Sequence, residues 1–210
     1  MPRIRHISKK PDEKLFYLID TNFLVNKYLP IRRISDRRER ARVKASQAWW
    51  KFIDEQIRQR KAIIYSPDVC IAEAFKVLAK KYYIDHCFWN TYYYKRARDR
   101  LSRDIHISPK VLKSSNRFIP FHDISTSRDV IIAVDRFFEK FMKANLNVSI
   151  PDLIILATAK YLIDFYNIPD DRLIIVTMDN ALWKGSKIIK DIPSAFNPNT
   201  INESAKIVFE

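Results

Sequence analysis

The stretch from Leu15 to Val25 reads LFYLIDTNFLV, and it decides the fold class of this 210-residue chain. Its first five residues are all apolar, which is the pattern of a strand buried on both faces, as in a parallel sheet. The run stops at the polar triplet of residues 20–22, whose residue types cap helices, and apolar residues then return at helical spacing. This stretch therefore predicts a buried strand that leads directly into a helix.

Short apolar runs and helical patterns alternate along the rest of the chain. We expect further strands at residues 62–65, 117–121, 173–177 and 205–209. We expect helices over residues 127–143 and 152–165, and another that begins at Pro67 with Ser66 as its cap. Strands that alternate with helices predict an α/β fold with a parallel sheet that is covered on both faces.

Two segments, residues 32–60 and 82–116, look like helical insertions into this pattern. The first is mostly charged and becomes aromatic and aliphatic in its second half, whereas the second mixes tyrosines with arginines. No linker separates them from the remaining chain. We therefore expect a single domain over residues 1–210, with a core of about 15–209.

Composition excludes several function classes. The chain has 38 Lys and Arg against 24 Asp and Glu, a net charge of +14 that favours a polyanionic partner such as nucleic acid. The single glycine, Gly185, excludes glycine-rich phosphate loops. No apolar run reaches the ~20 residues that span a bilayer. The two cysteines and the absence of an export leader favour the cytoplasm, and the cysteines and histidines lack zinc-ligand spacing.

Four acidic residues carry the strongest chemical signal. Asp20 follows the first strand, Asp179 follows the fourth, Asp152 opens a buried helix, and Glu73 lies on the helix after the second strand. Taken singly, each Asp could be a helix cap and Glu73 a solvated helix residue. Together they can meet at the carboxyl edge of the sheet, where sites form in open parallel sheets. Carboxylates gathered there would require a hard cation, Mg²⁺ or Mn²⁺.

The sequence resembles the PIN domain of metal-dependent ribonucleases from about Leu15 to Phe209. Four motifs carry the resemblance in order: LFYLIDTNFLV with Asp20, YSPDVCIAEAF with Ser66 and Glu73, SIPDLIILATA with Asp152, and IIVTMDNALW with Thr177 and Asp179.

The resemblance implies a three-layer α/β/α sandwich around a parallel sheet of about five strands, with helical elaborations. It implies cleavage of single-stranded RNA that depends on Mg²⁺ or Mn²⁺, with Asp20, Glu73, Asp152 and Asp179 as catalytic metal ligands. Asn22, Thr177 and Asn180 would support these acids through hydrogen bonds. The related toxins of the VapBC toxin–antitoxin type are typically shorter, so a toxin and an RNA-processing or decay nuclease both remain open. A homodimer and a protein inhibitor are compatible with the resemblance.

Basic and aromatic residues in the two insertions are candidates for RNA contacts. Arg37, Arg38 and Arg40 would clamp phosphates, and Tyr93 with Arg96 and Arg98 would offer a stacking face beside charge. Charge runs and aromatic residues at helical spacing more often form solvated or packed helix faces, and that explanation stays open for both sets. Two alternative functions stay open, a non-catalytic RNA- or protein-binding module with this fold and a structure-specific DNA nuclease.

Overall fold

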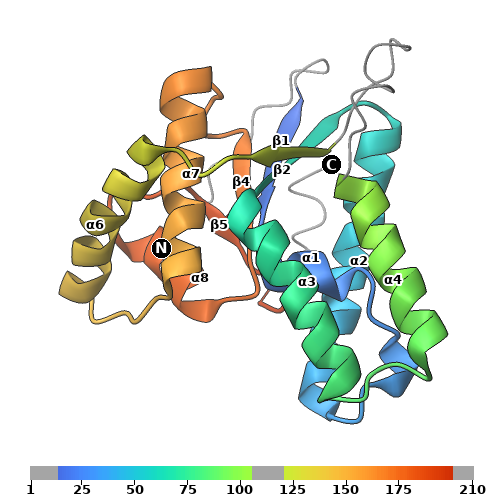
Figure 1. Cartoon of the computed structure of the whole chain (residues 1–210). Helices are drawn as coiled ribbons and strands as arrows, with labels where there is room; N and C mark the ends of the chain where they lie inside the picture. Colours follow the sequence, from blue (N-terminus) through green and yellow to red (C-terminus); the bar gives the residue numbers. More distant parts are fainter. Residues whose placement is uncertain (1–13, 106–120, 201–210) are drawn as a thin grey trace.

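The computed structural model describes residues 14–105 and 121–200. Its centre is a sheet of five parallel strands in the order β3-β2-β1-β4-β5 (Figure 1). The strands are β1 (Leu15–Ile19), β2 (Ala62–Pro67), β3 (Phe121–Ile124), β4 (Leu173–Val176) and β5 (Ala195–Phe196). The predicted parallel α/β fold is confirmed, with β1 in the middle of the sheet.

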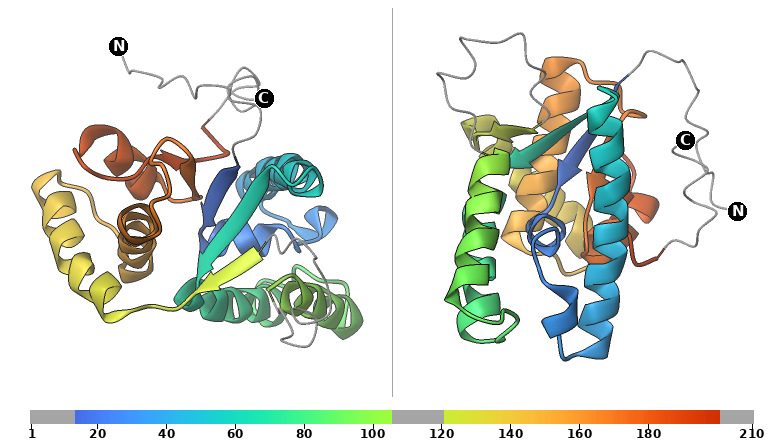
Figure 2. Two further views of the ribbon diagram at one scale, coloured as in Figure 1. Left: turned by 90° about the horizontal axis from the view of Figure 1, so that it is seen from above. Right: turned by 90° about the vertical axis from the view of Figure 1, so that its right-hand side faces the viewer.

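Helices cover both faces of this sheet, as the view from above shows (Figure 2). In chain order they are α1 (Thr21–Asn26), the 3₁₀ helix η1 (Ile31–Arg33), α2 (Arg37–Arg58), α3 (Asp68–Tyr83), α4 (Thr91–Ile105), α6 (Arg128–Lys143), α7 (Ile150–Tyr166) and α8 (Asn180–Ile188). The predicted three-layer α/β/α sandwich is therefore confirmed.

The alternation of side chains along the strands divides the core into two parts. Tyr17 and Ile19 of β1 pack into a cluster that includes α1, α2 and α4, whereas Leu18 points to the other face and packs with α6 and α7. In β4 the same alternation places Ile174 on the first side and Ile175 on the second. Because both faces are covered, the central strands β1 and β4 are apolar throughout, which explains their continuous apolar runs in the sequence.

Two of the predicted element boundaries are wrong. The second strand continues through Pro67, so Ser66 lies inside β2, and it does not cap α3. The strand expected at residues 117–121 instead spans Phe121–Ile124, and residues 117–120 lie outside the described part. Pairing explains both shifts, because Ser66 and Pro67 are aligned with residues 123 and 124 of β3.

The other expectations fare better. The helices predicted at 127–143 and 152–165 appear as α6 and α7, and Ser127 caps α6. The first insertion forms η1 and α2, whose second half docks through buried Trp50 and Ile53. The second contains the end of α3 and all of α4, while residues 106–116 and the strand expected at 205–209 lie outside the described residues. None of the described helices is long and apolar enough to cross a membrane.

Candidate functional site

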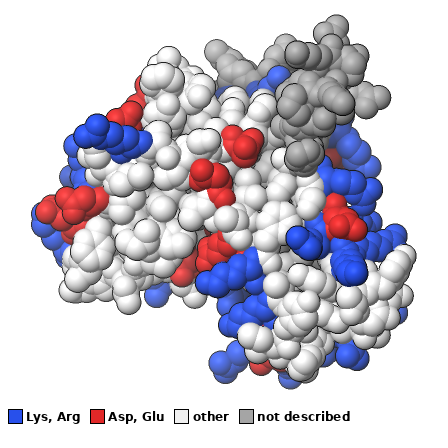
Figure 3. Space-filling model, in the orientation of Figure 1, with Lys and Arg blue, Asp and Glu red and all other residues white. Residues whose placement is uncertain are grey.

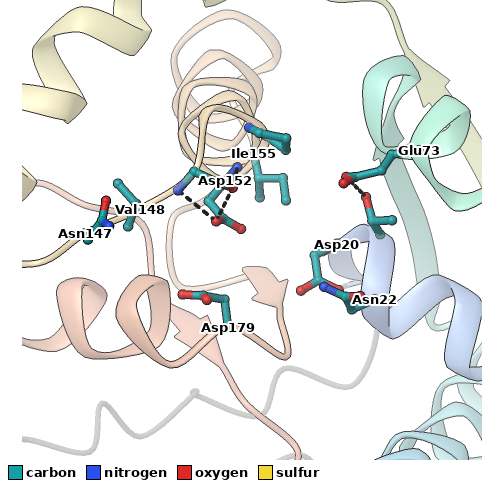
Figure 4. Close-up of a pocket in the computed structure, with 11 residues that line it drawn as sticks. Asp20, Asn22, Glu73, Asn147, Val148, Asp152, Ile155 and Asp179 are labelled. Carbon is teal, nitrogen blue, oxygen red and sulfur yellow. Dashed lines mark hydrogen bonds between the residues drawn. The ribbon is translucent and has the colours of Figure 1, made fainter. Parts of the chain in front are cut away.

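The four predicted acids line one cavity of about 410 Å³ at the carboxyl edge of the sheet (Figure 4). Asp20 comes from the end of β1, Glu73 from α3, Asp152 from the start of α7, and Asp179 from the turn before α8. The remaining lining residues are Thr21, Asn22, Asn147, Val148, Ser149, Pro151 and Ile155. Segments that are up to 159 positions apart in sequence thus contribute carboxylates to the same space.

Strand pairing brings the first and last acids together. Ile19 at the end of β1 is aligned with Val176 at the end of β4, so Asp20 and Thr177 leave the sheet side by side. The Thr177 hydroxyl donates to Asp20 Oδ2 at 2.6 Å and accepts from the Asp179 backbone N–H at 2.9 Å. This fully buried threonine therefore connects the two acids.

Asp20 is buried, with only 3% of its surface exposed. Its Oδ1 accepts from the Phe23 backbone N–H at 2.6 Å, which caps α1, and its Oδ2 also accepts from the Met178 backbone N–H at 2.8 Å. Burial raises the pKa of Asp20 to about 6, and the negative charge of Asp152 adds to this rise, although the hydrogen bonds oppose it. Ionisation of this carboxylate therefore lowers the free energy of unfolding of the protein.

Glu73 and Asp152 are each oriented by a hydroxyl group. The Thr21 hydroxyl donates to Glu73 Oε2 at 2.8 Å. Ser149 caps α7 and shares a reciprocal capping box with Asp152, in which its hydroxyl lies 2.5 Å from Asp152 Oδ2. Burial raises the pKa of Asp152, and the charges of Asp179 and Glu73 raise it further, against the effect of the Ser149 hydrogen bonds. The acids thus repel one another across the cavity.

Asp179 caps α8, because its Oδ1 accepts from the Leu182 backbone N–H at 2.7 Å. Capping and membership of the acidic cluster are therefore compatible at Asp20, Asp152 and Asp179. Each of them fixes the start of a helix, and each is placed at the cavity by doing so. A role as a helix cap therefore does not exclude a role in the acidic cluster.

The donor set fits a hard divalent cation, although it is not a preformed cage. Within the described part of the chain, no three His, Cys, Asp or Glu side chains stand close enough to hold a metal ion. Figure 4 shows Asp20 and Glu73 on one side of the cavity and Asp152 and Asp179 on the other. Mg²⁺ uses only one or two carboxylates and keeps several waters, so a ring of oxygen donors around a polar cavity suits it. Their mutual repulsion is what a cation would relieve.

The predicted supporting residues divide into two groups. Thr177 binds Asp20, and Asn22 lines the cavity from the first turn of α1. Asn180 lies just beyond, where its Oδ1 accepts from the Asn197 side chain at 3.0 Å, and it does not line the cavity. The Asn180 side chain therefore holds the segment after β5.

None of the predicted RNA-contacting side chains lines the cavity. Arg37 and Arg38 lie exposed at the start of α2, and Tyr93, Arg96 and Arg98 lie exposed on α4. Arg40 donates from Nε and Nη2 to the Ile34 carbonyl oxygen at 2.8 and 2.6 Å. Its guanidinium therefore holds the turn before α2, which weakens its assignment as a phosphate clamp.

Three polar side chains lie near the acids although the sequence did not predict contacts of theirs with the site: Thr21, Ser149 and Arg42. Thr21 and Ser149 bind acids as described above, and Arg42 on α2 donates to the Met178 carbonyl oxygen at 3.1 Å, next to Asp179. Ser149 could have been found, because Ser three residues before an acid is a capping-box signal. Thr21 and Arg42 act on residues 52 and 136 positions away, and no local pattern indicates such contacts.

The sequence matches no protein-family model and no curated protein. Solved structures do match. That of FitAcB from Neisseria gonorrhoeae has a TM-score of 0.51 at 15% identity and covers 88% of this chain and 99% of the other. FitAB bound to an IR36 DNA fragment has a TM-score of 0.52 at 14% identity, with 89% and 98% covered. VapBC2 from Rickettsia felis, bound to a DNA fragment from their promoter, has a TM-score of 0.51 at 14% identity, and the match covers 87% of this chain and 98% of the other.

The chain has a PIN-like fold. The matches extend over nearly all of the solved chains, so this fold accounts for the whole described core. At such low identity, similarity shows the fold alone, and chemistry has to be argued from the side chains of this protein.

Proposed function

We propose that the chain is a metal-dependent endoribonuclease that hydrolyses phosphodiester bonds of single-stranded RNA at the acidic cavity. One observation carries this proposal: four carboxylates from four separate segments line one cavity at the carboxyl edge of a parallel sheet. The burial of Asp20 and the repulsion between the acids make the arrangement unfavourable by itself. Such an arrangement is expected where a cation and an anionic substrate are bound.

Asp20, Glu73, Asp152 and Asp179 would hold Mg²⁺ or Mn²⁺. When bound, such an ion supplies an activated water and neutralises charge on the phosphodiester. The role of the protein is to position oxygen donors, and it does so through short hydrogen bonds from Thr177, Thr21 and Ser149 to the carboxylates. These hydroxyls fix which carboxylate oxygen faces the cavity.

Asn22 has a different role in this proposal. It is exposed in the first turn of α1 and lines the cavity beside Asp20. Its amide can donate a hydrogen bond, unlike the carboxylates around it. We assign Asn22 to the orientation of a phosphate oxygen, since side-chain amides are common donors to phosphates.

RNA as the substrate is supported by the charge of the chain. The net charge of +14 attracts a polyanion despite the acidic cavity. Figure 3 shows Asp and Glu near the centre of one face, with Lys and Arg beside and below them. An acidic centre with basic residues beside and below it suits an RNA strand, because its phosphates away from the reacting bond can contact cations.

The cellular setting belongs to the same proposal. We place the enzyme in the cytoplasm, where the free, buried thiols of Cys70 and Cys87 stay reduced. A protein inhibitor as a partner, as in a toxin–antitoxin pair of the VapBC type, belongs to the same proposal. Dimer formation stays a prediction.

Cleavage assays test the proposal directly. Labelled single-stranded RNA and DNA of equal sequence are incubated with wild type, Asp20→Asn and Asp152→Asn in Mg²⁺, in Mn²⁺ and in EDTA. Glu139→Gln is the matched control, because this acid lies exposed on α6 away from the cavity. We expect wild type and the control to cleave RNA in Mg²⁺ or Mn²⁺ but not in EDTA. The cleavage rate should fall at least about a hundredfold in both cavity variants.

Two outcomes would contradict it. RNA binding without cleavage in either metal would indicate a non-catalytic binding module. Cleavage of DNA in preference to RNA would indicate a DNA nuclease that uses the same acids.

A further inference from the structure

Aromatic side chains form an exposed cluster where α3 ends and α4 begins, at the lower right in Figure 1. We call the exposed members the aromatic platform. They are Tyr83 (65% exposed), Trp89 (50%), Tyr92 (64%) and Tyr93 (44%). Large rings are usually buried, and a cluster this open that plays no part in the core indicates a binding surface.

The platform is held rigidly from beneath. Tyr82 and Tyr94 stack with ring centroids 4.6 Å apart and planes within 3°, and Phe88 packs against both. The Tyr82 hydroxyl lies 2.6 Å from the Thr91 hydroxyl at the start of α4. Tyr83 packs edge-on against Tyr82 and Tyr94, and Tyr93 contacts the rings of Trp89 and Tyr92. These contacts restrict the exposed rings before a ligand binds, which lowers the entropy cost of binding.

The helix α3 connects this platform to the acidic cavity. Glu73 lies at the cavity, and Lys76, Lys80 and Tyr83 follow it at helical spacing on the same side of α3. Both lysines are exposed. The ten steps from Glu73 to Tyr83 cover about 15 Å of helix, a span for a few nucleotides of extended strand.

Cations also lie within the platform itself. The Arg33 guanidinium lies over the Trp89 ring, with 6.0 Å between its Cζ atom and the ring centroid. Arg96 is exposed on α4, one turn after Tyr92 and Tyr93. Rings with a neighbouring positive charge are the combination that binds single-stranded nucleic acid, through base stacking and phosphate contacts. Rings and arginines also occur at protein interfaces, whereas lysines are depleted there, so the exposed Lys76 and Lys80 between the platform and the cavity are what favours RNA.

We infer that single-stranded RNA runs from the acidic cavity along α3, with its phosphates on Lys76 and Lys80 and its bases stacked on the aromatic platform. This inference rests on the proposed function for the direction of the strand, and it concerns binding. It adds Lys76, Lys80, Tyr83, Trp89 and Tyr92 to the substrate contacts. It also makes the platform a subsite a few nucleotides away from the bond that is cut.

The test measures affinity without cleavage. A fluorescein-labelled RNA of about 12 nucleotides, within the range of single-strand sites, is titrated with the full chain in EDTA, and anisotropy is recorded. Tyr83→Ala and Tyr92→Ala should each weaken binding about tenfold, whereas Tyr83→Phe should keep it. Phe165→Ala is the matched control, because this ring is 66% exposed on α7 at the opposite edge of the sheet, and it should bind as wild type does.

Salt dependence and an altered ligand identify the type of contact. Lys76→Gln and Lys80→Gln should each lower the slope of log affinity against log salt by about 0.7, the value for one phosphate contact in a single strand. With an RNA in which the bases are replaced by abasic sites, Tyr83→Ala should bind no worse than wild type, because stacking needs a base. Circular dichroism and unfolding curves of each variant exclude a folding defect.

Failure of this inference and failure of the proposed function give different results. If wild type cleaves RNA while the platform and lysine variants bind and cleave as it does, the inference is overturned and the nuclease stands. If wild type binds RNA without cutting and the platform variants bind less, the inference stands and the nuclease fails. If the platform variants lose only self-association in sedimentation, the surface is a protein interface and the inference is overturned.

Discussion

The replacement of Asp20 by Asn should stabilise the protein in the absence of metal. The pKa of Asp20 is about 6 in the folded protein against its ordinary value of 3.8, which corresponds to about 3 kcal/mol at neutral pH. Asn keeps the cap on α1 but presents an N–H₂ group toward Thr177 and the Met178 N–H, which costs about 1–2 kcal/mol. We therefore expect a net gain of about 1–2 kcal/mol at pH 7.5.

The pH dependence has a definite sign. A carboxyl whose folded pKa is raised penalises folding once it is ionised, so the penalty on wild type grows as pH rises from about 4 to about 6. The advantage of Asp20→Asn should therefore shrink to nothing or reverse near pH 4. Urea unfolding followed by tryptophan fluorescence at several pH values, in EDTA, measures this.

A metal ion should reverse the order of the two proteins. Manganese at about a hundred times its dissociation constant should stabilise wild type by about 2.7 kcal/mol, and it should stabilise the Asn variant much less. Asp36→Asn is the matched control, since Asp36 caps α2 through the same bond, 2.6 Å to the N–H three residues on, but does not line the cavity. A variant at position 20 that behaves like this control would refute the reasoning, because Asp20 would then be a helix cap and nothing more.

Three further changes test other parts of the structure. Thr177→Val should cost about 1–3 kcal/mol in urea unfolding and weaken Mn²⁺ binding in calorimetry, because it removes the donor to Asp20; unchanged metal affinity would contradict this. Gly185→Ala should destabilise by about 1–3 kcal/mol despite the better helix propensity, because its Cβ would lie 2.4 Å from the buried Phe141 ring, and Phe141→Leu in the same chain should recover part of the loss. Burial raises the pKa of the Cys70 thiol to about 12, so this thiol should resist iodoacetamide at pH 8 in the folded protein and react after unfolding. Rapid labelling of Cys70 in the native protein would contradict this and show that the structure around Cys70 opens.

The local signals in the sequence were sufficient for the centre of the fold. β1 and β4 are short apolar runs that end at capping residues, so both their bounds and the position of the acids beyond them could be predicted. The chain reverses between these elements through helices with clear apolar stripes, such as α6. In such segments local propensity and tertiary packing agree, which is why they are predictable.

The errors fall where long-range pairing outweighs local preference. Ser66 followed by Pro67 is a good helix start, yet pairing with β3 extends β2 through both residues. Pro67 is tolerated there because it is the last residue of the strand. The five-stranded sheet is completed by Ala195–Phe196, a strand of two residues that no periodicity could reveal.

The acids of the site were predictable, but their surroundings were not. A strand end marks Asp20 and Asp179, because carboxyl ends of parallel strands share one edge. By contrast, the hydroxyls that orient the acids act across the fold, as Thr21 does on Glu73 and Thr177 on Asp20. Which oxygen each acid offers to the cavity is decided by these contacts, and only the folded structure contains them.

The hydroxyl bridge at Thr177 has a consequence for the protein during its translation. Asp20 is synthesised early, but Thr177 and Asp179, which complete its surroundings, follow more than 150 residues later. A nascent chain on the ribosome therefore carries an incomplete set of carboxylates while the messenger RNA and ribosomal RNA are within reach. The order of segments along the chain therefore delays the assembly of the four-carboxylate cavity until translation is nearly over.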